Sequence, residues 1–188
     1  MKQFNIGLFG FGNVGRGLYD VLVQTNQQHA TIKRVCVRNI NKDRGVDKAL
    51  FTDNADDIFN DPDINMIVEL IDDATASLSI VTRALKAHKP VVTGNKHMLA
   101  HHLEDLVALQ RETGTPLLYD ASACGSIPVI RNLEEYYDND LLVSVKGILN
   151  GTSNFILSKI FNENMSYPDA LKLAQDLGFA EANPISDI

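Results

Sequence analysis

The chain has 188 residues, 45% of them hydrophobic and 22% charged, with a formal net charge of −7. No basic stripe is present to neutralise phosphates, and no apolar run reaches the length of a membrane span, so we expect neither a nucleic-acid nor a membrane partner. Two widely separated cysteines, Cys36 and Cys124, form no disulfide framework, and no signal-peptide pattern opens the chain. We therefore expect a globular cytoplasmic protein.

The first predicted elements are a strand, a glycine turn and a helix. Phe4 to Phe9 is an apolar run typical of a buried strand, and apolar residues recur at helical spacing over residues 14–22. Between them, Gly10, Gly12 and Gly15 have the spacing G-x-G-x-x-G. Such glycines permit the tight turn, the approach of the backbone to a pyrophosphate and close packing of the helix on the strand. This context predicts a dinucleotide-binding turn, and the alternative is a glycine-rich turn that binds nothing.

Strand and helix patterns alternate through the rest of the first 130 residues. We expect further strands over Thr31 to Arg38, Asn65 to Ile71, Pro90 to Thr93 and Pro116 to Tyr119, and helices over residues 13–27, 55–60, 74–87 and 98–113. This alternation indicates a parallel sheet with crossover helices. We therefore predict an α/β fold, a doubly wound parallel-sheet dinucleotide-binding (Rossmann) domain, over residues 1–130.

The pattern changes over residues 131–188. We expect helices over Ile127 to Tyr137, Thr152 to Asn162 and Tyr167 to Leu177, and a strand over Leu142 to Leu149. Ser166 is the predicted N-cap of the last helix, and Gly178 its predicted C-terminal stop. So short a segment gives too small a core for good independent stability. We interpret it as the truncated start of an α+β domain.

The end of the second predicted strand bears on the choice of dinucleotide. NAD-binding domains carry an acidic residue about 20 residues beyond the glycines, where it contacts the ribose hydroxyls. Here the strand ends in Val37, Arg38 and Asn39, with no acid at its tip. Arg38, helped by Lys42 or Arg44, suits the 2′-phosphate of NADP. We predict NADP as the preferred cofactor, with NAD as the alternative.

Three segments follow predicted strands and fall at the sheet edge where α/β proteins bind ligands. They are residues 69–73, 92–96 and 119–128. Lys96 stands at a strand end directly before a helix, from where its ammonium group can bind a carboxylate or polarise a carbonyl oxygen during hydride transfer. The alternative is a solvated lysine, which the helix dipole disfavours at a helix start.

Taken together, these segments resemble the N-terminal part of homoserine dehydrogenase, namely its cofactor domain and the start of its substrate domain. The resemblance rests on residues 10–15, 69–71, 93–96, 127–128, 147–157 and 177–184, in order along the chain. The run from Gly147 to Leu157 is the most specific of these. The resemblance implies reversible reduction of aspartate 4-semialdehyde to homoserine with NAD(P)H, in threonine and methionine biosynthesis.

The resemblance also implies roles for individual residues. Besides Arg38, the residues expected to hold the cofactor are Gly10, Phe11, Gly12, Asn13, Val14, Gly15, Ile71, Asp72 and Lys96. Lys96 is also expected to be catalytic, close to the nicotinamide and the substrate. The residues that match the substrate pocket are Gly151, Thr152, Glu181 and Asp187. A monovalent-cation site is implied at the Asp120 carboxylate and the backbone carbonyls of Ala123, Gly125 and Ile127.

The sequence departs from the family pattern at several positions. Asp72-Asp73 stands where the family commonly has two glycines, and Asp120 where it usually has glutamate. Residues 124–126 replace a glycine-rich stretch, and Asn183 replaces a frequent aspartate. The family's general acid/base lysine lies shortly beyond the position of Ile188, so we expect this polypeptide to bind nucleotide but turn over poorly. The intact protein is expected to be a homodimer.

Two other function classes stay open. One is a different NAD(P)-dependent dehydrogenase of amino-acid metabolism. An aspartate-semialdehyde dehydrogenase would need a nucleophilic cysteine, for which Cys124 is the candidate, and no histidine lies near it in sequence. The other class is a non-catalytic dinucleotide-binding module.

Overall fold

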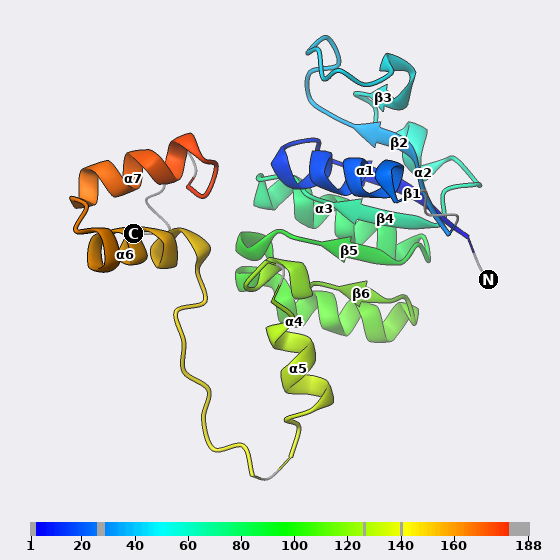
Figure 1. The fold of residues 1–188 in the computed structure, drawn as a ribbon. Coiled ribbons are helices and arrows are strands. Elements are labelled where there is room, and N and C mark those ends of the chain that lie inside the picture. The colour runs from blue at the N-terminus through cyan, green and yellow to red at the C-terminus, as the bar shows by residue number, and fades with distance from the viewer. Residues whose placement is uncertain (1–2, 26–28, 126, 140, 181–188) are drawn as a thin grey trace. The chain divides into compact units, whose positions relative to one another are not determined.

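The computed structural model describes residues 3–25, 29–125, 127–139 and 141–180 (Figure 1). The chain divides into two compact units, Met1–Ser122 and Ala123–Ile188. Among the described residues, none of the helices combines the length and the apolar character that crossing a membrane requires.

The first unit is built on a six-stranded sheet. Its strands are β1 (Phe4–Phe9), β2 (Ala30–Cys36), β3 (Phe51–Thr52), β4 (Met66–Glu69), β5 (Val91–Thr93) and β6 (Leu117–Leu118). They lie in the order β3-β2-β1-β4-β5-β6, and every neighbouring pair is parallel. The order reverses between β1 and β4, which is the topological switch point of a doubly wound sheet. The predicted fold class is confirmed.

Helices connect the strands of the first unit. They are α1 (Asn13–Gln24), α2 (Asp56–Phe59), α3 (Ala74–Lys86) and α4 (Lys96–Thr113). Side chains alternate between the two faces of a strand. Phe9 and Ile67 therefore join one buried cluster with residues of α3 and α4, whereas Leu8 and Val68 join a second cluster with residues of α1.

The helical pattern predicted over residues 14–22 is only partly used for packing. Leu18 and Leu22 of α1 pack against the second cluster, but Val14 and Val21 are exposed. Two residues beyond the predicted elements also take regular structure. Phe51 and Thr52 form β3. A strand of two residues is too short to be predicted from alternation of apolar and polar residues.

The second unit contains α5 (Val129–Glu135), α6 (Gly151–Glu163) and α7 (Tyr167–Asp176). Ile156 of α6 and Ala170 and Ala174 of α7 form the centre of a small core. The predicted caps are confirmed: Ser166 Oγ accepts a hydrogen bond from the Asp169 amide at 3.3 Å, and Gly178 has a left-handed φ of 78°.

The strand predicted over Leu142 to Leu149 is wrong. These residues form an irregular segment in which Val143 is about nine-tenths exposed, as is Leu141 just before it. The β-branched composition suits a strand, but a strand is stable only when a neighbour pairs with its backbone and covers one of its faces. The described part of the second unit contains no strand for this segment to join.

Candidate functional site

Four neighbouring strands end at one level of the sheet. Phe9, the last residue of β1, lies in register with Cys36 of β2 and with Glu69 of β4. Glu69 in turn lies in register with Thr93, the last residue of β5. The loops that follow carry the predicted cofactor residues of the first unit. The fold therefore brings the ends of these segments together at the edge where open α/β sheets bind their ligands.

The glycine turn is shaped by close backbone contacts. Gly10 has a φ of 93°, and a Cβ on it would lie 2.5 Å from the Leu70 carbonyl oxygen. A Cβ on Gly15 would lie 2.5 Å from the Gly10 carbonyl oxygen, so helix α1 can approach the turn only because that residue has no side chain. Phe11 turns its ring inward, at 5.1 Å from the ring of Phe51.

Gly12 differs from the other two glycines of the motif. It is the N-cap of α1, it makes no side-chain capping bond, and no acidic residue occupies the first turn of the helix. A Cβ on Gly12 would meet no protein atom within 4 Å. Packing within the protein therefore does not require glycine here, whereas the approach of a pyrophosphate to the helix N-terminus does. The residues present fit a dinucleotide.

A buried carboxyl group organises the loop after β4. Glu69 has no exposed surface, and its Oε1 accepts a hydrogen bond from the Ile71 amide at 2.7 Å. Its Oε2 accepts from the Ser77 hydroxyl at 2.5 Å and from the Thr93 hydroxyl at 2.6 Å. Three donors from the β4 loop, α3 and β5 thus share one carboxylate, which fixes these segments relative to one another.

The start of α4 is tied to the same network. Asn95 is the N-cap of α4: its Oδ1 accepts from the Met98 amide at 2.8 Å, and its Nδ2 donates to the Ile71 carbonyl at 2.9 Å. The cap begins the helix at Lys96, two residues before the predicted start at Met98. Lys96 is exposed, and Asp72 lies beside Ile71 and is also exposed. Asn95 therefore joins the loop after β4, which carries Ile71 and Asp72, to the first turn of α4, which begins at Lys96.

The tip of β2 carries an ion pair that reaches the loop after β4. The Arg38 guanidinium lies 2.9 Å from Oδ2 of Asp73, the N-cap of α3. The other carboxylate oxygen of Asp73 accepts from the Ala76 amide at 2.9 Å. That backbone hydrogen bond, followed by the nearby Arg38 charge, lowers the pKa of Asp73 from its ordinary value. Of the two predicted helpers, Arg44 lies over the ring of Phe51, 5.1 Å from its centre.

The predicted substrate residues belong to the second unit. Gly151 is the first residue of α6, and Thr152 follows it in the first turn. Thr152 is buried, and its hydroxyl donates to the Phe179 carbonyl at 2.5 Å. Glu181 and Asp187 lie outside the described residues.

The predicted cation site draws on both units. Asp120 begins a 3-10 turn at the end of the first unit, whereas Ala123, Gly125 and Ile127 belong to the second. The structure describes each unit separately, so the cation site, which needs residues of both units, stays a prediction. Cys124 and Gly125 both have left-handed φ angles, 61° and 58°. Cysteine thus takes a conformation that suits the glycine-rich stretch of the family pattern.

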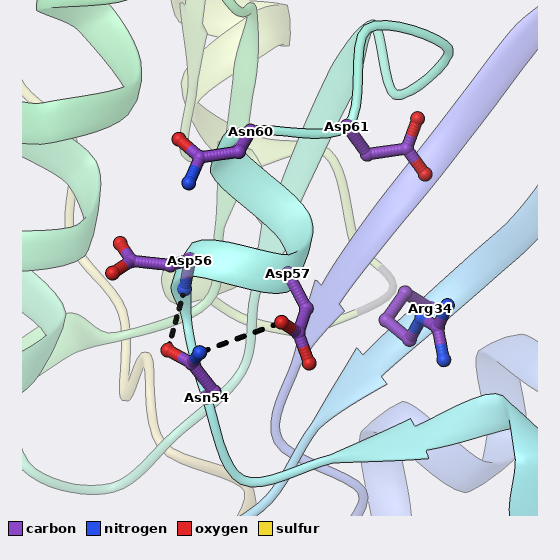
Figure 2. A pocket seen from close by; sticks show the side chains of 6 residues that line it. All are labelled: Arg34, Asn54, Asp56, Asp57, Asn60 and Asp61. Carbon is purple, nitrogen blue, oxygen red and sulfur yellow. Dashed lines mark hydrogen bonds between the residues drawn. The ribbon is translucent and has the colours of Figure 1, made fainter.

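A separate hollow of about 550 Å³ lies beside α2 (Figure 2). Its lining is polar, and three of its six residues are acidic: Arg34, Asn54, Asp56, Asp57, Asn60 and Asp61. The Asn54 side chain donates to Asp57 at 3.4 Å and accepts from the Asp56 amide at 3.0 Å. None of the lining residues belongs to the glycine turn or to the ends of β1, β4 and β5, so the hollow is distinct from the candidate site.

Two features of the site escape prediction from the sequence. From the sequence, Glu69 is recognised only as a member of the segment 69–73 at the sheet edge. Its burial is not predicted, because an acidic residue at the end of a strand is usually exposed. The ion pair of Arg38 and Asp73 joins residues 35 positions apart. The sequence hints at it only through the aspartate at position 73, where the family that the chain resembles commonly has glycine.

Comparisons with known proteins match both units. Residues 10–120 match the family model of the homoserine dehydrogenase NAD-binding domain, and residues 128–188 match that of homoserine dehydrogenase. The homoserine dehydrogenases of Bacillus subtilis and Helicobacter pylori are 39% and 40% identical, over all of this chain and 46% and 45% of their own lengths. A crystal structure of a homoserine dehydrogenase from Thiobacillus denitrificans is 36% identical, with a TM-score of 0.82 over all of this chain and 46% of that one. The chain therefore spans a little less than half the length of these relatives.

Proposed function

The chain belongs to the homoserine dehydrogenase family, and on that premise we propose that it supplies the nucleotide site and part of the substrate site of an NAD(P)-dependent oxidoreductase. The proposed reaction interconverts aspartate 4-semialdehyde and homoserine in threonine and methionine biosynthesis. The observation that carries the proposal is the glycine turn at the switch point of the sheet, together with Lys96 at the start of α4, whose N-cap Asn95 is bonded to the Glu69 network. A cytoplasmic location and a homodimer are part of the same proposal.

The glycine turn is proposed to bind the pyrophosphate. The first-turn amides of α1 carry no side-chain cap, and Gly12 leaves room for a close backbone approach. Ile71 and Asp72 are proposed to lie along the cofactor on the β4 side of the turn. When bound, the nicotinamide supplies or accepts the hydride.

The adenosine end is proposed to favour NADP over NAD. Arg38 follows β2 and has a largely exposed guanidinium, a group whose planar set of donors matches a phosphate. Arg44 belongs to the loop between β2 and β3, and its position over Phe51 places it near Phe11 of the glycine turn. The proposal assigns the 2′-phosphate to Arg38, with Arg44 as the second basic residue at this end of the cofactor.

Lys96 is the proposed catalytic residue of this chain. Its ammonium group is proposed to stabilise the negative charge that develops on the substrate oxygen as the aldehyde is reduced. The cap at Asn95 and its bond to the Ile71 carbonyl hold the start of α4, where Lys96 lies. A polypeptide limited to these 188 residues is proposed to bind nucleotide with little turnover.

The substrate is proposed to contact Gly151, Thr152, Glu181 and Asp187 of the second unit. Thr152 already donates its hydroxyl proton to Phe179, so the hydroxyl oxygen remains an acceptor for a substrate ammonium group. A monovalent cation at Asp120, Ala123, Gly125 and Ile127 is proposed to complete the intact enzyme.

A pair of glycine substitutions tests the nucleotide site. A methyl group at Gly12 meets no protein atom, and the same holds at Gly17 on the exposed side of α1. Gly12→Ala should therefore fold normally but weaken NADPH binding on the order of tenfold, because each 1.4 kcal/mol of lost contact is a factor of ten. Gly17→Ala is the matched control and should bind NADPH as the unsubstituted protein does. Equal affinities of both variants in titration calorimetry would overturn the proposed site.

A further inference from the structure

Asp73 is the residue of the candidate site that the proposed reaction leaves without a role. It stands at the N-cap of α3, where the resembling family commonly has glycine, and its carboxylate lies 2.9 Å from the Arg38 guanidinium. Arg38 is the same residue that is proposed to bind the 2′-phosphate. The structure therefore contains an internal anion at the group that would recognise the anion of the cofactor.

The Asp73 carboxylate is held in place independently of Arg38. Oδ1 accepts from the Ala76 amide at 2.9 Å, and this leaves Oδ2 for the arginine. The backbone hydrogen bond and the arginine charge both lower the pKa of Asp73, so the carboxylate is charged throughout the neutral range. A carboxylate fixed by a helix cap cannot swing away freely when a phosphate arrives.

Two consequences follow for the adenosine end of a dinucleotide. A 2′-phosphate that binds Arg38 must share its donors with Asp73 and lie close to a second negative charge, which costs free energy. A cofactor with a free 2′-hydroxyl lacks that repulsion, and its hydroxyl can donate a hydrogen bond to the carboxylate. The pair thus disfavours NADPH relative to what Arg38 alone would give.

We propose that Asp73 is a specificity-determining residue, whose carboxylate competes with the 2′-phosphate for Arg38 and narrows the preference for NADPH over NADH. The proposal rests on the proposed function, since it assumes that the adenosine ribose lies at the tip of β2. Both side chains are substantially exposed, with 81% of Arg38 and 43% of Asp73 accessible. The effect on affinity is therefore that of a surface ion pair, about three- to fivefold.

The substitutions Asp73→Asn and Asp73→Ser test the proposal without removing the helix cap. Asparagine and serine both offer an oxygen to the Ala76 amide but carry no charge. Dissociation constants for NADPH and NADH are measured by calorimetry, together with those of adenosine 2′,5′-bisphosphate and AMP, which probe the adenosine end alone. Glu104→Gln, on the exposed side of α4, is the control for a change of one unit in net charge.

Both Asp73 variants should bind NADPH and the bisphosphate about three- to fivefold more tightly, with no gain for NADH and AMP, which lose the carboxylate as an acceptor for their 2′-hydroxyl. The gain should vanish in an Arg38→Gln background and should be absent in Glu104→Gln. An unchanged NADPH:NADH ratio, or a gain that persists without Arg38, would overturn this proposal while nucleotide binding by the unsubstituted protein stood. Failure of every form to bind either nucleotide would overturn the proposed function, and this proposal with it.

Discussion

Removal of the Glu69 carboxyl group should destabilise the first unit more than the loss of other acidic side chains. Glu69 is fully buried and accepts hydrogen bonds from the Ile71 amide and from the hydroxyls of Ser77 and Thr93, which are also fully buried. In Glu69→Ala all three donors lose their acceptor. Each buried donor left unsatisfied costs about 1–3 kcal/mol, so we expect a loss of about 3–9 kcal/mol in the free energy of unfolding.

The substitution Glu69→Gln separates the hydrogen bonds from the side-chain volume. The amide keeps the shape and one acceptor oxygen, and a neighbouring hydroxyl can rotate to accept from the new amino group. We expect a loss of about 1–2 kcal/mol, the value of one hydrogen bond that is not replaced. Glu104→Gln, at an exposed position of α4, should change the free energy of unfolding by no more than about 0.5 kcal/mol.

Urea unfolding followed by far-ultraviolet circular dichroism measures the three variants, and it suits a chain without tryptophan. The slope of free energy against urea should stay constant, so that shifts of the midpoint report stability. A domain of ordinary stability has about 5–15 kcal/mol to lose. If Glu69→Ala leaves no folded protein, Glu69→Gln decides the matter. The reasoning is refuted if Glu69→Gln unfolds at the same urea concentration as Glu104→Gln.

Two further predictions concern Lys96 and Asp73. In the full-length enzyme, Lys96→Ala should lower kcat on the order of 100-fold and leave the dissociation constant for NADPH within about twofold, because the charge acts on the developing alkoxide; an equal loss of NADPH affinity in calorimetry would make Lys96 a cofactor contact instead. Because the folded-state pKa of Asp73 is lowered, its contribution to stability is present above the unfolded-state pKa and is lost as the pH falls through the folded-state value. Asp73→Asn should therefore be less stable than the unsubstituted protein at neutral pH and equally stable in acid, and a difference that persisted through acid urea titrations would contradict this assignment.

The fold could be predicted because its determinants are local. The G-x-G-x-x-G spacing follows an apolar strand, and alternating strand and helix patterns leave few topologies once crossovers are right-handed. The outcome for Gly178 and Ser166 likewise depended on their nearest neighbours in sequence. By contrast, the segment from Leu142 to Leu149 has the composition of a strand, but its structure depends on partners that no local pattern contains.

The chemistry of the site was harder to predict because it depends on contacts between segments far apart in sequence. Lys96 can be singled out from its place before a helix, but the start of that helix at Lys96 depends on the Asn95 cap, and Asn95 also bonds the Ile71 carbonyl 24 positions away. The role of Glu69 depends on the hydroxyl of Thr93, which is equally distant in sequence. Such contacts become visible only when the strands are placed in register.

Two acidic residues at this edge of the sheet, Glu69 and Asp73, differ in burial. That difference explains how one edge can both hold the proposed catalytic lysine and bind the adenosine end of the cofactor. Glu69 lies in the interior, where an unpaired hydrogen-bond donor is costly, so the loop that carries Ile71 and the start of α4 at Lys96 are held in one arrangement. Arg38 and Asp73 lie in solvent, where an ion pair is weak and can exchange for another partner. The edge is therefore rigid beside the proposed catalytic lysine and adjustable at the adenosine end. The Asp73 side chain bonds Arg38 and the Ala76 amide, and its link to the Glu69 network is the backbone carbonyl that accepts from the Ser77 amide at 2.9 Å. A substitution at Asp73 keeps that carbonyl, so we expect it to change cofactor choice by a few-fold without disturbing the start of α4 at Lys96.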